Sequence, residues 1–271
     1  MLDELTALHS PMSPVMVVGA RCRDALHVAL GHNGPLRATN DLDLALAVSS
    51  WEQFETLTTG LTPIRASGST IRYQVSGIPV DLVPFGPPVE DPDGTVSPPP
   101  REDTMSVFGF QDVYDTAPEL QLAPGLAVRL PTIPGYALLK LKAWADRSPD
   151  GEYRDGGDLA CALFWYQEFP EIRDRLYGDD PSDHGHIERT GWDEPLAAVR
   201  LLIADAVALV PEDRRRELIA AWPAADRDGL LARELARARV PGWPAVGDRR
   251  LSAYATAIRE VLSGSGGRAM I

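Results

Sequence analysis

The hydrophobic positions of the first half switch between strand-like and helix-like spacing. Residues 15–19 form a Val-rich apolar run that stops at Gly19, and the apolar residues between 22 and 30 recur at helical spacing. This pattern predicts a strand, a glycine turn and a helix. After a polar turn, the segment "DLDLALAV" at 41–48 is strand-like, with acidic residues where the strand begins.

Helices and strands continue to alternate up to about residue 130. "WEQFETLTTGL" predicts a helix capped by one of the two preceding serines. Strands are expected at 70–75 and 78–83, joined by an "SG" turn, and two more within 119–130. Six prolines between residues 86 and 103 exclude a central strand or a helix interior and predict a long exposed loop.

The pattern becomes predominantly helical after Pro134, interrupted by a polar segment at 178–192 that we expect to be a linker or loop. We therefore expect an α+β fold, with a mixed sheet and flanking helices in residues 1–130 and a mostly helical domain in residues 131–271. The expected helices are 135–147, 154–168, 193–209, 212–221, 226–238 and 250–263.

Composition narrows the class of protein. No apolar run reaches the roughly 18 residues of a membrane span, and the acidic N-terminus lacks the layout of a signal peptide, so we expect a cytoplasmic protein without membrane contact. The two cysteines, Cys22 and Cys161, are too few for a disulfide framework or a four-thiolate zinc site and are expected to be reduced packing residues. A net charge of −13 argues against binding nucleic acid by bulk attraction.

Three carboxylates at strand positions are the strongest chemical signal. Alternation places Asp41 and Asp43 on one face of a strand, and a neighbouring strand can bring Asp81 beside them. Such a cluster is costly unless a cation neutralises it, and Mg²⁺ favours carboxylate, phosphate and water oxygens. We expect Asp41 and Asp43 to bridge two Mg²⁺ ions, and Asp81 to bind the catalytic ion and accept the proton of the nucleophile.

The glycine turn offers a place for phosphate. Gly19 leads directly into a predicted helix, whose first backbone N–H groups and dipole attract anions. We expect Gly19, Ala20 and Arg21 to contribute these groups to a triphosphate. A strand, turn and helix followed by an acidic pair within about 25 residues is a much stronger signal than the glycine alone.

Three segments carry a resemblance to a known family: "VVGARCRDAL", "RATNDLDLALAV" and "GIPVDLVPFG". They resemble the nucleotidyltransferase superfamily that includes DNA polymerase β, in its prokaryotic branch related to AbiEii/AbiGii-type toxins. The resemblance covers roughly residues 15–165 and implies a nucleotidyltransferase-type sheet. The matching positions are Gly19 and Ala20 in the turn, Arg37, Thr39, Asp41 and Asp43 in the acidic stretch, and Asp81 on the later strand. The match implies that Arg37 and Thr39 help to bind the nucleotide.

The resemblance continues into the helical half. "LPTIPGYALLKLKAWADR" and "RDGGDLACAL" look like the branch's lysine helix and its Lys-Asp-x-x-Asp-Leu helix start. This implies that Lys140 neutralises phosphate charge and that Asp158 orients Lys140 or the base. Two positions depart from the pattern. Ala20 stands where many members of the family have a serine, so the serine hydroxyl is missing. Arg154 stands where a lysine is usual, which keeps the positive charge but changes its geometry.

The resemblance implies an Mg²⁺-dependent nucleotidyltransferase that moves a nucleoside monophosphate from an NTP to an acceptor hydroxyl and releases pyrophosphate. The acceptor would be tRNA or a protein, as for a toxin with a cognate antitoxin. The acidic charge favours an alternative small-molecule acceptor, a cationic aminoglycoside antibiotic. A third alternative is a non-catalytic module that binds nucleotide or a partner with the same fold.

Simpler interpretations compete at several positions. Arg37 could form a surface salt bridge or brace the acidic loop, and Asp155 and Asp158 could simply cap a helix. The "DHGH" at 183–186 is expected to be a solvated loop rather than a metal site. Four aromatic residues at helical spacing are expected in the core: Tyr136, Trp144, Phe164 and Trp165.

The two lysines of the chain lie two positions apart in one predicted helix, whereas the other 24 basic residues are arginines. Side chains two positions apart on a helix point about 200° apart, so both lysines cannot face one site. The motif selects Lys140 and leaves Lys142 as a solvent-exposed or flanking residue.

Overall fold

The computed structural model describes residues 15–64, 70–225 and 229–264. The fold is α+β, as predicted, with about 51% helix and a mixed seven-stranded sheet. The chain divides into two compact units, the first formed by Met1–Leu26 and Ala38–Thr132 and the second by His27–Arg37 and Ile133–Ile271.

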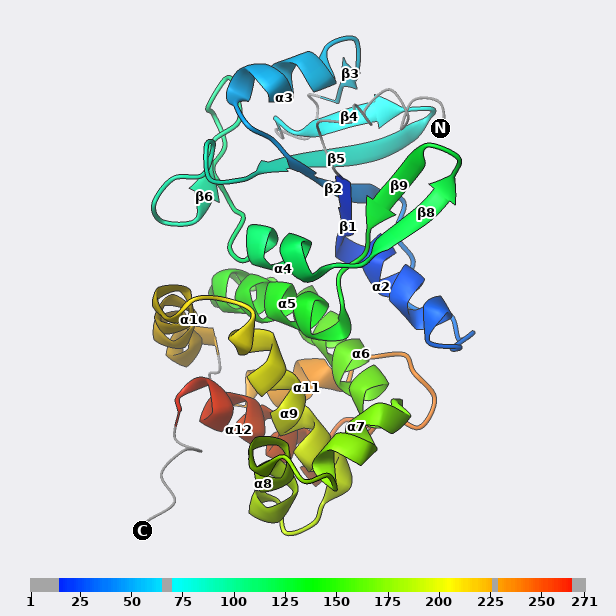
Figure 1. Ribbon diagram of the computed structural model, residues 1–271, viewed down its shortest axis with the longest axis vertical. Coiled ribbons are helices and arrows are strands. Elements are labelled where there is room, and N and C mark those ends of the chain that lie inside the picture. The colour runs from blue at the N-terminus through cyan, green and yellow to red at the C-terminus, as the bar shows by residue number, and fades with distance from the viewer. Residues whose placement is uncertain (1–14, 65–69, 226–228, 265–271) are drawn as a thin grey trace. The chain divides into compact units, whose positions relative to one another are not determined.

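The first unit is built on the seven-stranded sheet, whose order is β3-β4-β5-β2-β1-β9-β8 (Figure 1). The central strand β2 pairs in parallel with β5 and antiparallel with β1, and β1 pairs in parallel with β9. The strands are β1 (Val15–Val18), β2 (Leu42–Ala47), β3 (Thr62–Pro63), β4 (Arg72–Val75), β5 (Ile78–Phe85), β8 (Glu119–Ala123) and β9 (Leu126–Arg129).

The middle of β2 shows why this strand lies at the centre of the sheet. Leu44, Ala45 and Leu46 are consecutive and all buried, so both faces of the strand are covered. Polar residues precede this run, which places them where β2 enters the sheet. Within the described residues up to 132, the helices are α2 (Gly19–Ala29), α3 (Trp51–Thr58) and α4 (Phe110–Thr116), and the sequence of α2 belongs partly to each unit.

The proline-rich segment at 86–103 is mainly a loop, as predicted, but it contains a short strand and several buried residues, so the expectation that it is exposed throughout is wrong. A short strand, β6 (Thr95–Val96), pairs antiparallel with β7 (Met105–Ser106). Val89 and Val96 are buried although prolines surround them. The prolines lie outside the β6 and β7 pairing, so their missing N–H groups remove none of its hydrogen bonds.

The second unit is helical, and α9 supplies much of its core, with nine buried residues. The predicted core aromatics Tyr136, Trp144 and Trp165 are almost fully buried, whereas Phe164 is half-buried. The helices are α5 (Ile133–Arg147), η2 (Ser148–Asp150), α6 (Arg154–Glu168), α7 (Pro170–Leu176), α8 (Pro181–Arg189), α9 (Glu194–Ala208), α10 (Glu212–Ala225), α11 (Leu230–Leu235) and α12 (Arg249–Leu262).

The polar segment at 178–192 is not a loop, because α8 occupies most of it. Asp180 caps the helix by accepting a hydrogen bond from the Ser182 N–H, and Pro181 occupies the first turn, where its missing N–H is not needed. The "DHGH" residues therefore lie on a helix, and the expectation of a solvated loop is wrong. The sequence contains these start signals, but polar composition masked them.

Three further findings bear on the sequence predictions. Of the helix expected at 226–238, residues 226–228 lie outside the described residues, and α11 covers Leu230–Leu235. Cys22 and Cys161 are both buried and not disulfide-bonded, as expected of packing residues. Within the described part of the chain, no helix is both long enough and apolar enough to span a bilayer.

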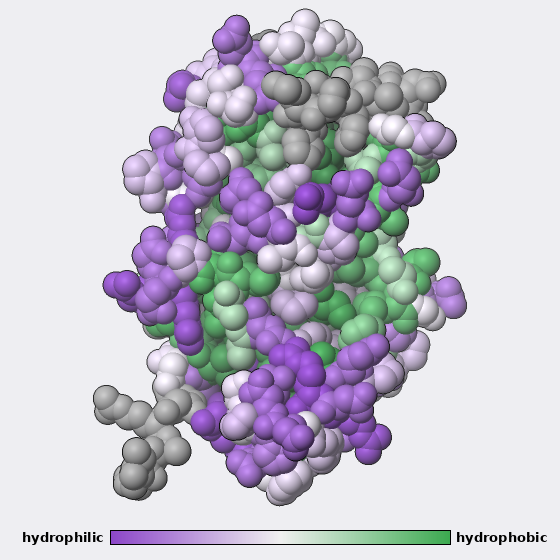
Figure 2. All heavy atoms as spheres, viewed as in Figure 1, coloured by the Kyte–Doolittle hydropathy of each residue, from purple (hydrophilic) through white to green (hydrophobic). Residues whose placement is uncertain are grey.

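On the visible surface, hydrophilic residues predominate around α8 (Figure 2).

Candidate functional site

Three carboxylates come together in the first unit where β2 and β5 pair. These strands run parallel with Asp43 directly opposite Asp81, and Asp41 immediately precedes β2. Each of the three offers a carboxylate oxygen, and these oxygens all lie within 4.8 Å of one another. All three residues are half-buried. The arrangement has the oxygen ligands and the access to water that a hard divalent cation requires.

Gly19 lies directly against this cluster. Its neighbour Val18 pairs with Asp43 across β1 and β2, and Gly19 begins α2. The backbone of Gly19 has a φ of +64°, and a Cβ atom there would lie 1.9 Å from Oδ2 of Asp43. Only glycine satisfies both the left-handed conformation and this close approach. The predicted glycine turn and the predicted acidic pair are therefore parts of one local structure.

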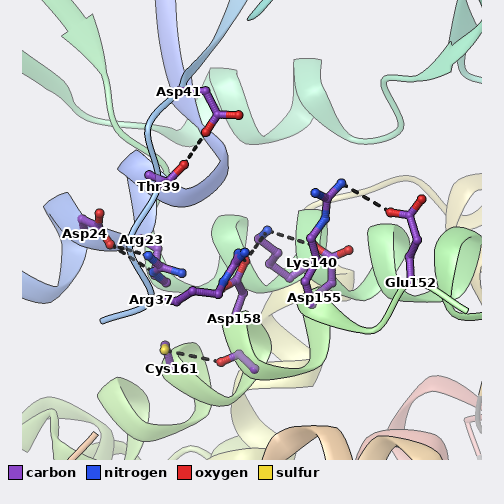
Figure 3. A network of polar contacts seen from close by, with 12 residues as sticks. Arg23, Asp24, Arg37, Thr39, Asp41, Lys140, Glu152, Asp155, Asp158 and Cys161 are labelled. Carbon is purple, nitrogen blue, oxygen red and sulfur yellow. Dashed lines mark hydrogen bonds and ion pairs between the residues drawn. The ribbon is translucent and has the colours of Figure 1, made fainter. Parts of the chain in front are cut away.

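The first turn of α2 continues the site on the side of the glycine. Ala20 and Arg21 follow Gly19 in this turn. The Arg21 guanidinium donates to the carbonyl of Thr39 at 3.3 Å, which connects α2 to the segment that leads into β2. Thr39 in turn donates its hydroxyl hydrogen to Oδ1 of Asp41 (Figure 3). Asp41 is thus held in place by a threonine two residues earlier.

Arg72 on β4 also belongs to the cluster, and the sequence interpretation missed it. Its Nε and Nη2 each donate to one oxygen of Asp81 at 2.6 Å, and Nη2 also contacts Oδ2 of Asp41 at 3.3 Å. A signal was present in the sequence. The two-residue turn at Ser76 and Gly77 pairs Val75 with Ile78, and counting back three pairs places Arg72 opposite Asp81.

The electrostatics of the cluster are unbalanced. The pKa of the Arg72 guanidinium is raised by its hydrogen bond with Asp81, although burial opposes this, and by the charges of Asp81, Asp41 and Asp43. One guanidinium faces three carboxylates, which leaves two negative charges among these four residues. The side chains of Asp41 and Asp81 are 37% and 16% exposed, so water and ions can approach them.

A second polar cluster lies in the helical unit around Lys140. Its Nζ donates to Oδ1 of Asp155 at 2.9 Å and to Oδ2 of Asp158 at 2.8 Å (Figure 3). Arg147 also contacts Asp155, at 3.2 Å, and Arg37 contacts Asp158, at 3.4 Å. Burial disfavours the charged form of Lys140, but the two carboxylates outweigh it and raise its pKa.

This second cluster corrects one of the simpler interpretations. Asp155 and Asp158 do not cap α6, because Tyr153 is the capping residue and makes no side-chain capping hydrogen bond. Both acids are buried and bind Lys140 instead. Arg37 contacts Asp158 from 121 residues away, a pairing that local sequence patterns could not reveal. Arg154, the departure from the family pattern, is mainly exposed and contacts Glu152 at 3.4 Å.

Lys142 faces a different environment from Lys140. Its Nζ contacts Asp146 at 2.7 Å and Glu217 at 3.4 Å, and the side chain is 12% exposed. The expectation of a solvent-exposed lysine is therefore wrong, whereas the flanking position agrees with the structure. The two lysines do not share acidic partners among their described contacts.

The predicted site residues thus form two groups. Gly19, Ala20, Arg21, Thr39 and the three acids lie in the first unit, whereas Arg37, Lys140 and Asp158 lie in the second. No protein-family model and no curated protein matches this chain. The resemblance to nucleotidyltransferases therefore rests on the residues themselves.

Proposed function

We propose that the protein is a divalent-metal-dependent nucleotidyltransferase, which transfers a nucleoside monophosphate from an NTP to an acceptor hydroxyl. The observation that carries this proposal is the meeting of Asp41, Asp43 and Asp81 within 4.8 Å, directly beside the Gly19 turn. The order of β1, turn, α2 and β2, with β5 beside β2, also supports a nucleotidyltransferase-type first unit.

The residues present fit a magnesium site. All three offer carboxylate oxygens, the ligand type that Mg²⁺ prefers, and partial exposure leaves room for water and phosphate ligands. The Arg72 guanidinium lies against two of the acids, which supports a position that favours positive charge. Asp41 and Asp43 would hold two ions, and Asp81 one of them. The bound ions would neutralise phosphate charge in the reaction.

In the proposed reaction the acceptor oxygen forms a bond to the α-phosphorus, and the bond from that phosphorus to the β-phosphate oxygen breaks. Pyrophosphate leaves with the bonding electrons, and a carboxylate oxygen of Asp81 takes the proton of the acceptor hydroxyl. The N–H groups of Gly19, Ala20 and Arg21 bind the triphosphate, because helix N-termini attract anions.

We also propose the roles that the resemblance implies for two residues of the helical unit: Lys140 neutralises phosphate charge, and Asp158 orients Lys140 or the base. The contact of 2.8 Å between Lys140 and Asp158 supports Asp158 as the residue that orients the ammonium. Asp155 binds the same ammonium, so two carboxylates fix its position. If Lys140 also neutralises phosphate, its one positive charge acts on the phosphate and on these two carboxylates together.

Two acceptor classes follow from different observations. The motif resemblance favours tRNA or protein as acceptor, with a cognate antitoxin as partner. The net charge of −13 favours a cationic small molecule such as an aminoglycoside. A non-catalytic nucleotide- or partner-binding module is the remaining alternative, and retaining three acids at close range disfavours it, because unused clustered acids repel one another.

The test is to incubate the protein with Mg²⁺ and each α-labelled NTP, in separate reactions with total tRNA, cell protein or aminoglycosides. We expect label on one acceptor class and release of pyrophosphate, both lost in Asp43→Asn. Asp115→Asn is the matched control, since Asp115 is exposed and accepts a hydrogen bond from Gln111 instead. If no acceptor is labelled and Asp43→Asn binds NTP as the parent does, the proposal fails.

A further inference from the structure

Arg72 and Asp81 form the most complete ion pair of the acidic cluster. Both oxygens of Asp81 accept hydrogen bonds from the same guanidinium, each at 2.6 Å. Such two-pronged pairs are short and strongly directional. An arginine cannot lose its charge in a protein, so this positive charge is permanent. Asp81 can shed it only if the side chain of Arg72 moves away.

The sheet itself builds this pair. Arg72 is the register partner of Asp81 in the antiparallel β4–β5 pair. The pairing extends one residue further, because the N–H of Leu82 donates to the carbonyl of Ile71 at 2.9 Å. The two backbones therefore remain side by side, so a side chain must rotate to separate the charges, and the longer arginine side chain has the greater reach. A side chain that is 29% exposed has solvent on one side into which it can rotate.

A divalent cation and the guanidinium compete for Asp81. A magnesium ligand oxygen must approach to roughly 2.0–2.1 Å, and two cations on one carboxylate repel each other at short range. Arg72 also reaches Asp41, at 3.3 Å, so its charge acts on more than one of the acids. The cation that needs Asp81 is consequently opposed for as long as Arg72 stays in place.

We propose that Arg72 is a positioning residue that holds Asp81 until nucleotide binds, and so sets how many divalent cations the three acids accept. The triphosphate offers the guanidinium a second anion with suitable two-pronged geometry. Transfer of Arg72 from Asp81 to phosphate releases the carboxylate for the cation. This inference rests on the proposed function, because it assumes that the acids bind metal and the site binds an NTP.

The experiment measures Mn²⁺ binding by the full-length protein, with free Mn²⁺ followed by electron paramagnetic resonance at fixed ionic strength. For the parent we expect one Mn²⁺ without nucleotide and two with a non-hydrolysable NTP analogue. For Arg72→Ala we expect two without nucleotide, or binding at least about tenfold tighter. Asp81→Asn added to Arg72→Ala should remove that gain.

Two further variants separate charge from shape and from general effects. Arg72→Lys keeps the positive charge but loses the planar guanidinium that makes two hydrogen bonds to Asp81. Its Mn²⁺ binding should therefore fall between that of the parent and that of Arg72→Ala. Arg101→Ala removes the same charge from the same unit, where the guanidinium lies over the Trp51 ring, and should bind Mn²⁺ as the parent does. Circular dichroism confirms that each variant folds. If Arg72→Ala fails to fold, Arg72→Gln takes its place.

The outcomes distinguish the two proposals. If the parent binds Mn²⁺ through Asp43 but Arg72→Ala binds it equally or more weakly, the role of Arg72 is overturned and the metal site stands. If neither the parent nor Arg72→Ala binds Mn²⁺ with or without nucleotide, the metal site and the role of Arg72 both fail. If Arg101→Ala gains as much Mn²⁺ binding as Arg72→Ala, the gain comes only from the change in net charge, and the inference is overturned.

Discussion

The two acidic clusters of the chain use similar residues to opposite effect. In the helical unit, Asp155 and Asp158 are almost fully buried and face three cationic side chains, those of Lys140, Arg37 and Arg147. In the sheet unit, three acids are half-buried and face Arg72. The carboxylates of the first cluster are matched by cations of the chain itself, whereas Arg72 and the three acids of the second together carry a net negative charge near solvent.

Burial explains the difference. A charge removed from water is tolerated only when partners surround it, so a dry cluster must carry its own counter-charges. A partly exposed cluster can instead bind cations from solution as its counter-charges. The degree of internal neutralisation therefore separates a cluster that stabilises the fold from one that is available for chemistry.

The largest effect is expected for Asp43→Asn. Even residues that only support metal ligands change affinity or activity by about 10- to 100-fold, so loss of a ligand should reduce nucleotide transfer by more than about 100-fold. The free energy of unfolding should stay the same or rise, because one repelling charge disappears. Initial-rate assays and urea denaturation measure the two quantities. A parallel loss of stability and activity would place Asp43 among structural residues.

Lys140→Met should show the reverse pattern in the free energy of unfolding. It leaves two buried carboxylates without their shared ammonium, which should destabilise the protein by about 3–5 kcal/mol. Lys142→Met is the control, because the partners of Lys142 are about one-third exposed and the expected loss is about 1 kcal/mol or less. Equal losses in urea denaturation would contradict the distinction between the two lysines.

A charge-conserving pair of variants asks whether Lys140 also serves catalysis. Lys140→Arg keeps the positive charge but replaces a compact ammonium with a broad guanidinium between two carboxylates. We expect transfer to fall well beyond any loss of stability, whereas Lys142→Arg should be nearly silent. Rates normalised to the folded fraction provide the comparison. Parent-like transfer by Lys140→Arg would confine Lys140 to a structural role.

Gly19→Ala should damage the acidic cluster through the backbone. The methyl group would collide with Asp43 Oδ2, and a residue other than glycine is strained at this φ, so we expect a loss of about 1–3 kcal/mol in the free energy of unfolding. Displacement of Asp43 should also weaken Mn²⁺ binding. Gly77→Ala is the control, since it has a similar φ and an open surrounding. Unchanged Mn²⁺ affinity in Gly19→Ala would contradict the close packing.

The smallest effect concerns pH and the helical unit. Burial lowers the pKa of His186, and the charges of Arg200 and Arg189 lower it further. The unfolded chain therefore takes up the proton first as pH falls below about 6.5, and stability decreases on acidification by at most about 1.4 kcal/mol per pH unit. His186→Gln should flatten this slope in denaturation curves between pH 7 and 5. An unchanged slope would show that other groups cause it.

The parts of the site that follow local patterns were predictable, and those set by long-range pairing were not. Alternation placed Asp41 and Asp43 on one face, a neighbouring strand was expected to bring Asp81 beside them, and a glycine before a helix indicated the turn. The contact of Arg37 with Asp158 spans 121 residues and leaves no local trace. Arg72 lay between these cases, because its register could be counted from the turn.

The fold shows the same division. The α+β class followed from the change of hydrophobic spacing after Pro134, which reflects strand and helix periods directly. The segment containing α8 was misread because its polar composition outweighed the capping aspartate and the proline at its start. Polar helices on a surface carry a weak hydrophobic pattern, so their end signals deserve more weight than their average composition.

The proposal that the three acids bind metal is tested most directly by an anomalous difference map from crystals grown with Mn²⁺ and a non-hydrolysable NTP analogue. This proposal predicts Mn²⁺ peaks coordinated by Asp41, Asp43 and Asp81, and none beside Asp155 and Asp158. A map with no peak at the three acids at saturating Mn²⁺, or with a peak only in the Lys140 cluster, would contradict it.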